Sequence, residues 1–239
     1  IIAPWNFPIG MVMAPLAGVF AAGNRAIAKP SEFTPAVADL FAKLVPQYFA
    51  PEELAIVTGG ADVGQAFSQL PFDHIIFTGA TGVGKHIMRA AADNLVPVTL
   101  ELGGKSPVVV MPDVDVAATA PGVAGAIFFN AGQVCVAGSR LYAHRSVFDK
   151  VVEGMAETAP FWAPRASLDP EAHMGAIISK EQHDKVMGYI EAGKRDGASV
   201  AMGGDAPSGN GYFVNPTILV DVNPQMSVVR EEIFGPVVV

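Results

Sequence analysis

The sequence has 239 residues, of which 51% are hydrophobic and 16% charged, so it is long and apolar enough to bury a sizeable core. Its net charge of −8 disfavours a nucleic-acid partner, because phosphate backbones are bound by clustered Lys and Arg. The longest apolar stretch, near residues 9–23, contains Pro15 and three glycines and is shorter than the ~20 residues of a membrane span. The single cysteine excludes an internal disulfide and favours a reducing, cytoplasmic location.

Short apolar runs alternate with helical patterns through the first part of the chain. Strands are expected at "IIAPW", "RAIAKP", "LAIVTGG", "HIIFTG" and "VPVTLELGG". Helices are expected at residues 8–22, 31–49, 61–70 and 83–92, with Thr34 as N-cap and Pro35 at the first helical position of the second. This order is typical of βαβ units and a parallel sheet.

The alternation restarts after the "LGGK" segment at 102–105. Strands are expected at "SPVVVM", "SRLYAH", "SVAMGG" and "FVNPTILVDV", and helices at residues 114–129, 146–157 and 179–196. We therefore expect an α/β fold with one domain over residues 1–103 and a second over residues 104–239. Both chain ends are strand-like, which favours a central piece of a longer protein, truncated at both ends.

The stretch "IIFTGATGVGKH" satisfies the first part of a phosphate-binding P-loop pattern. The pattern fails at His86, where Ser or Thr would offer a hydroxyl to Mg²⁺. A G-x-G-x-x-G pattern fails at Ile87. The remaining signal is a strand, a tight turn and a helix N-terminus, whose backbone N–H groups can face an anion.

Three residues are candidates for chemistry. Cys135, in "NAGQVCVAGSR", has small neighbours that would let a substrate approach a thiolate, although an inert buried cysteine is the alternative. Glu101 ends an apolar strand, where burial would raise its pKa toward the range of a general base, or it is a solvated strand end. Asn6, in "PWNFP", is a turn residue whose amide could also donate to an oxyanion.

Six segments together resemble the aldehyde dehydrogenase superfamily. They are "PWNFP", "KPSE", "FTGATGVG", "ELGGKSP", "GQVC" and "EEIFGPV", in the family's order, with Glu101 and Cys135 separated by 34 positions as in the family. The resemblance implies a Rossmann-like cofactor domain over residues 1–103 and an α/β catalytic domain over residues 104–239.

The resemblance implies oxidation of an aldehyde to a carboxylic acid with NAD. Cys135 would attack the aldehyde, Asn6 and the Cys135 backbone N–H would hold the oxyanion, and Glu101 would activate the water that hydrolyses the thioester. It further assigns a set of cofactor-binding positions: Trp5, Lys29, Glu32, Gly79, Ala80, Glu232 and Phe234. Glu32 favours NAD, because a carboxylate repels a 2′-phosphate, although some relatives with this Glu also use NADP. Ala80 departs from the family, which often has Ser there.

Two other functions stay open at this point. A relative of the fold could pass the acyl group to coenzyme A, although such relatives typically lack the Glu at position 101. A non-catalytic member of the fold is disfavoured by the intact set of Asn6, Glu101 and Cys135. The five histidines are scattered and predict no metal site. Within the family, "KPSEFTP" and "FTGATGVGK" look most like the coniferyl aldehyde dehydrogenase branch, and a homodimer or homotetramer is expected.

Overall fold

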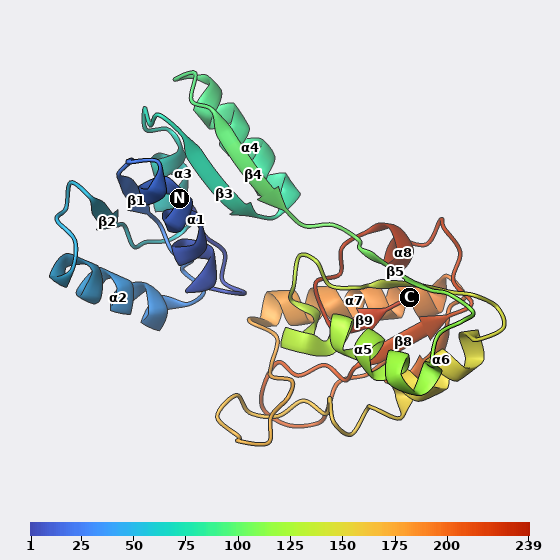
Figure 1. Ribbon diagram of the computed structural model, residues 1–239. Helices are drawn as coiled ribbons and strands as arrows, with labels where there is room; N and C mark the ends of the chain where they lie inside the picture. Colours follow the sequence, from blue (N-terminus) through green and yellow to red (C-terminus); the bar gives the residue numbers. More distant parts are fainter. The chain divides into compact units, whose positions relative to one another are not determined.

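The computed structural model describes all residues, 1–239, which form two compact units (Figure 1). The first unit is Ile1–Gly103 and the second is Gly104–Val239, so the chain divides within the "LGGK" segment. Each unit has its own sheet and its own core, and each is described separately below.

The first unit is built from short parallel strands and covering helices. Its elements are α1 (Gly10–Ala21), β1 (Ala26–Ala28), α2 (Pro35–Leu44), the 3₁₀ turn η1 (Val45–Gln47), β2 (Leu54–Ile56), α3 (Ala61–Ser68), β3 (Ile75–Gly79), α4 (Thr81–Ala92) and β4 (Val98–Leu102). Pairs β1–β2 and β3–β4 are parallel, with Ala26 beside Leu54 and Ile75 beside Val98.

The first residues of the chain join these two strand pairs. Ile2 forms parallel bridges with Lys29 on one side and Phe77 on the other. The Ile2 N–H donates to Ile76 at 2.8 Å, and the Ala3 N–H donates to Lys29 at 3.1 Å. The resulting parallel array has the order β2, β1, residues 1–3, β3, β4, and all carboxyl ends lie at one edge because every pairing is parallel.

Apolar packing holds the helices on this array. One cluster joins α1 to β1 and β2 and includes Val12, Leu16 and Leu54, while a second joins α4 to β3 and includes Phe77 and Ile87. Thr34 occupies the N-cap position of α2 as expected, but its hydroxyl donates to the carbonyl of Ser31 and makes no capping bond. Pro35 therefore starts the helix mainly through its fixed φ.

The second unit has a mixed sheet. Its elements are β5 (Pro107–Val110), α5 (Val116–Phe128), the 3₁₀ turn η2 (Phe129–Gly132), β6 (Arg140–Ala143), α6 (Phe148–Ala156), α7 (Lys180–Arg195), β7 (Ser199–Met202), β8 (Thr217–Val220), α8 (Ser227–Arg230) and β9 (Val237–Val238). Val239 accepts from the Leu141 N–H at 2.8 Å and donates to Ser139 at 3.0 Å, which places β9 beside β6. The order is β5, β6, β9, β8, β7, and only β7 is antiparallel to its neighbour.

Side-chain caps start the two principal helices of this unit. Asp115 accepts from the N–H groups of Ala117 and Ala118 at the start of α5, and Ser179 accepts from Gln182 at the start of α7. One continuous core lies beneath them and includes the fully buried Phe128, Val186 and Ile190. None of the helices in either unit is long and apolar enough to cross a membrane.

Most of the expected elements are present, with shifted ends, but the strand expected at "IIAPW" is reduced to isolated bridges at Ile2. Helix α1 begins at Gly10 instead of residue 8, and α4 begins at Thr81 instead of residue 83. Helix α8 was not expected from the sequence, and it has only four residues. The α/β character predicted from the alternating pattern is confirmed.

Candidate active site

Cys135 lies in a turn that follows a reversal of the chain after α5. Three successive residues adopt left-handed backbone angles, with φ of 51° at Asn130, 53° at Ala131 and 68° at Gly132. Left-handed backbone costs roughly 1–2 kcal/mol for a residue with a side chain, and such strain gathers at functional sites. The reversal brings a half-buried thiol to the start of a turn instead of leaving it inside a helix.

The buried side chain of Gln133 anchors this turn. Gln133 is 4% exposed, and its Nε2 donates to the carbonyl of Asn130 at 3.1 Å. Its Oε1 accepts from the Ile178 N–H at 3.0 Å, in the segment just before α7. The amide therefore fixes the backbone two positions before Cys135, and sequence analysis did not assign it a role.

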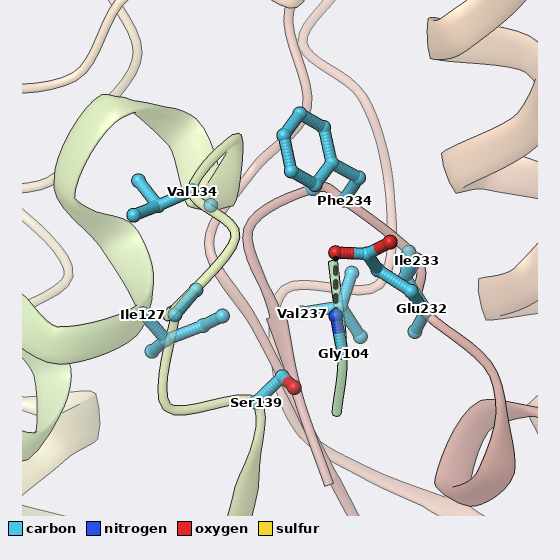
Figure 2. Close-up of a pocket in the computed structure, with 11 residues that line it drawn as sticks. Gly104, Ile127, Val134, Ser139, Glu232, Ile233, Phe234 and Val237 are labelled. Atoms are coloured by element: carbon cyan, nitrogen blue, oxygen red, sulfur yellow. Dashed lines mark hydrogen bonds between the residues drawn. The ribbon is translucent and has the colours of Figure 1, made fainter. Parts of the chain in front are cut away.

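The loop that carries the "EEIFGP" segment packs against this turn. A side chain at Gly132 would overlap the carbonyl of Gly235, so the two backbones touch. The segments "GQVC" and "EEIFGPV", about a hundred positions apart in the sequence, are therefore in contact in the structure. A narrow cavity of about 10 Å³ remains beside the contact, lined by both segments (Figure 2).

A backbone hydrogen bond and nearby lysine charges act on Glu232 in the same loop. Its Oε1 accepts from the Gly104 N–H at 3.3 Å, which Figure 2 shows as a dashed line. Burial raises the pKa of the Glu232 carboxyl, while the Gly104 N–H, Lys185 and Lys105 act in the opposite direction. Phe234, two positions on, has a left-handed backbone with φ of 58°.

Lys105 is a buried cation beside this carboxylate. Its Nζ is buried and has no hydrogen-bond partner. Burial and, to a smaller extent, the nearby Arg140 together lower the pKa of Lys105 to about 8, against the opposing effect of Glu232. Lysines are rarely buried unless they are paired, so the burial of Lys105 could not be predicted from its place in "ELGGKSP".

In the first unit, the predicted residues gather at the carboxyl edge of the parallel array. Trp5 and Asn6 follow the central residues 1–3, Lys29 follows β1, Gly79 ends β3 and Glu101 lies near the end of β4. Ligands of open parallel sheets bind at this edge. A dinucleotide at this edge stays a prediction.

Lys29 and Glu32 form an ion pair at this edge. The Lys29 side chain is buried, and its Nζ lies 3.2 Å from Glu32 Oε2 and 3.2 Å from the Pro30 carbonyl oxygen. Its stem lies near Gly64 in α3, where an added Cβ would make ordinary van der Waals contact with it. The carboxylate of Glu32 stays partly exposed and can accept further hydrogen bonds.

Gly79 and Ala80 form the turn into α4. A side chain at Gly79 would overlap the ring of Phe77, and one at Gly84 would press on Leu102, so both glycines allow close packing. Ala80 is the N-cap of α4 and makes no side-chain capping bond. No side chain at the N-cap therefore accepts from the first N–H groups of the helix.

The sequence left two environments open for Glu101, a buried carboxylate and a solvated strand end. Its side chain is exposed within the first unit, on the face of β4 opposite to Val98, Leu100 and Leu102. Within this unit Glu101 is therefore a solvated residue near the strand end. The three residues Cys135, Glu232 and Phe234 belong to the second unit, and the seven others belong to the first.

No group of three or more His, Cys, Asp and Glu side chains is placed to hold a metal ion.

The chain belongs to the aldehyde dehydrogenase family, since its whole length, residues 1–239, matches that family. A probable coniferyl aldehyde dehydrogenase of Caulobacter vibrioides is 45% identical over 99% of this chain and 49% of its own length. A coniferyl aldehyde dehydrogenase of a Pseudomonas species is 46% identical over 99% of this chain and 50% of its own length.

The solved structures agree with this assignment. The NAD⁺ complex of an aldehyde dehydrogenase from Bacillus cereus superposes with a TM-score of 0.95 at 40% identity, over 99% of this chain and 49% of that one. The aldehyde dehydrogenase fold inferred from the six segments is therefore confirmed. The chain spans about half the length of the curated relatives it matches.

Proposed function

We propose that this chain provides the cofactor edge and the nucleophile of an NAD-dependent aldehyde dehydrogenase that releases a free carboxylic acid. The observation that carries the proposal is the gathering of Asn6, Lys29, Gly79 and Glu101 at one carboxyl edge, within a chain of this family. Structures of relatives are NAD⁺ complexes, which supports the choice of cofactor.

The proposed cofactor-binding residues suit the parts of a dinucleotide. Lys29 and Glu32 would hold the adenosine ribose, the turn at Gly79 and Ala80 would receive the pyrophosphate, and Glu232 and Phe234 would meet the nicotinamide ribose and ring. When bound, NAD accepts the hydride removed from the substrate. Glu32 favours NAD over NADP by repelling a 2′-phosphate.

The proposed chemistry divides oxidation from hydrolysis. Cys135 gives its proton to solvent water and its sulfur forms a bond to the aldehyde carbon, while Asn6 and the Cys135 N–H donate to the resulting oxyanion. Loss of hydride from that carbon leaves a thioester on the sulfur. Glu101 takes a proton from water, the hydroxide adds to the thioester carbon, and cleavage of the C–S bond releases the acid and the thiolate.

Replacement of the nucleophile tests this proposal. In the intact protein that contains this chain, Cys135→Ala removes aldehyde-dependent NADH formation but leaves NADH binding, measured by fluorescence titration, unchanged. Leu168→Ala, which alters a side chain 98% exposed in the same unit, is the matched control and retains activity. Full activity in Cys135→Ala would contradict the catalytic assignment.

The acyl acceptor separates this function from its alternative. A coenzyme A-dependent relative would convert the thioester to acyl-CoA, whereas Glu101 favours water. The product mixture after turnover with and without coenzyme A, analysed by chromatography, is expected to contain only the free acid.

The names of two relatives support a proposal for the substrate class. Coniferyl-type aromatic aldehydes are proposed as the preferred substrates, because two relatives at 45% and 46% identity are named for coniferyl aldehyde. A panel of coniferyl aldehyde, betaine aldehyde and straight-chain aldehydes, ranked by kcat/KM, tests this choice. A homodimer or homotetramer in the cytoplasm is proposed for the intact protein. Sedimentation measures the oligomeric state.

A further inference from the structure

One face of α7 contacts the Glu231–Gly235 loop through Gln182, Val186 and Tyr189. Gln182, Lys185, Val186 and Tyr189 lie at spacings of three and four and so share this face. None of the four was assigned a role from the sequence. Their contacts with the loop are all within the second unit.

The first contact is a double hydrogen bond from Gln182. Its Nε2 donates to the carbonyl of Ile233 at 3.1 Å and to that of Phe234 at 2.9 Å. Phe234 has the left-handed backbone that a side chain disfavours, with φ of 58°. The Gln182 amide therefore stabilises the backbone at the point where the loop is most strained.

The second contact is made by Tyr189 at the other end of the loop. Its hydroxyl donates to Glu231 Oε2 at 2.6 Å, a short bond to a charged acceptor. Burial, followed by the bond to Glu231, raises the pKa of Tyr189 to about 12, so the hydroxyl stays a donor throughout the range in which dehydrogenases are assayed. Lys185 lies over the Tyr189 ring, with Nζ 6.0 Å from the ring centre.

Packing fixes the loop from both sides. A side chain at Gly235 would overlap Val186 of α7, and one at Gly132 would overlap the Gly235 carbonyl. The loop thus lies between α7 and the turn that precedes Cys135. A displacement of the loop would move Glu232 and Phe234 together and would press on that turn.

We propose that this face of α7 positions the Glu231–Gly235 loop for the cofactor, and that Tyr189 is a positioning residue that acts through Glu231. The inference rests on the proposed function, in which Glu232 and Phe234 meet the nicotinamide ribose and ring. Tyr189 holds the residue next to Glu232 and has no direct role in the reaction. Its removal is expected to weaken cofactor binding and to leave aldehyde binding unaltered.

A double-mutant cycle on the intact protein tests the pair. Tyr189→Phe removes one hydroxyl, Glu231→Ala removes its acceptor, and each is expected to raise the Kd for NADH and the KM for NAD about three- to tenfold. The double variant is expected to match the single ones, because both lose the same bond. The KM for aldehyde is expected to change less than about twofold, since the bond lies on the cofactor side.

Tyr142→Phe is the control, because it removes an exposed hydroxyl in the same unit and keeps the ring beside Arg140. Cofactor affinity within twofold of wild type in a folded Tyr189→Phe, or independent and additive effects in the cycle, would overturn the inference. If Tyr189→Phe does not fold, the cofactor affinity of Glu231→Ala alone tests the inference, since Glu231 is exposed. A wild-type protein that neither binds NADH nor oxidises aldehydes would instead refute the proposed function.

Discussion

At the scale of single residues, the six motif segments supplied every proposed catalytic and cofactor position. What they did not supply are the side chains that hold those segments in place. Gln133, Gln182 and Tyr189 make their contacts with residues 3 to 52 positions away, and the longest of these contacts exist only after the second unit has folded. Single-sequence patterns carry no signal for such pairings.

Glu101 gives the residue-scale prediction for hydrolysis. Glu101→Gln removes the base that activates water but leaves the nucleophile, so a rapid burst of NADH about equal to the enzyme concentration is expected, followed by turnover reduced about 10²- to 10⁴-fold. Stopped-flow absorbance measures both phases. A variant without a burst would show that Glu101 acts before the thioester forms.

Glu32 gives a second prediction, on cofactor choice. Glu32→Gln removes the charge that repels a 2′-phosphate, so the ratio of kcat/KM for NADP to that for NAD is expected to rise about tenfold, equivalent to about 1.4 kcal/mol. Glu52→Gln, in an exposed turn of the same unit, is the control and leaves the ratio unchanged. An unaltered ratio in Glu32→Gln would remove Glu32 from the cofactor site.

Lys105 gives a prediction about pH. Its pKa falls from 10.5 to about 8 on folding, so between these values the unfolded chain binds more protons than the folded one. The free energy of unfolding therefore rises with pH across that window. The destabilisation caused by the buried ammonium group is fully present below pH 8. Lys105→Met is expected to raise the free energy of unfolding at pH 7 by up to about 3 kcal/mol and to abolish this rise.

Denaturant unfolding of the intact protein at pH 7 and pH 10 measures the effect. Lys150→Met, on the exposed surface of α6, is the control and keeps the wild-type slope with pH. The same slope in Lys105→Met and wild type would contradict the buried, unpartnered state of this ammonium group.

At the scale of elements, the alternating pattern was sufficient to predict the strands and helices but not all of their partners. Periodicity identified β3, α4 and β4, which are five residues or longer. It could not show that residues 1–3 lie between β1 and β3, or that Val239 joins β9 to β6. Helix α8 has four residues, and tertiary packing decides elements of that length.

The contact between the Cys135 turn and the Glu231–Gly235 loop gives the element-scale prediction. Gly132→Ala combines a left-handed backbone with overlap of the Gly235 carbonyl, so stability is expected to fall by about 2–4 kcal/mol together with activity. Gly188→Ala, in α7 with open space around it, is expected to stabilise by about 0.5–1 kcal/mol. Thermal unfolding compares the two, and equal midpoints would contradict the backbone contact.

At the scale of the whole molecule, the sequence predicted two α/β parts divided near the "LGGK" segment. In the structure, one compact unit ends at Gly103 and the other begins at Gly104. Their roles as cofactor and catalytic domains stay predictions. The proposed reaction needs groups from both, because Glu101 belongs to the first unit and Cys135 to the second.

The central claim is that Cys135 forms a thioester during oxidation and that Glu101 removes it. Mass spectrometry of the intact Glu101→Gln protein, after mixing with aldehyde and NAD and quenching in acid, tests this directly. We expect one acyl group per chain, located on Cys135 by peptide mapping and formed only when NAD is present. An unmodified Cys135 after an NADH burst, or an acyl group on another residue, would contradict the claim.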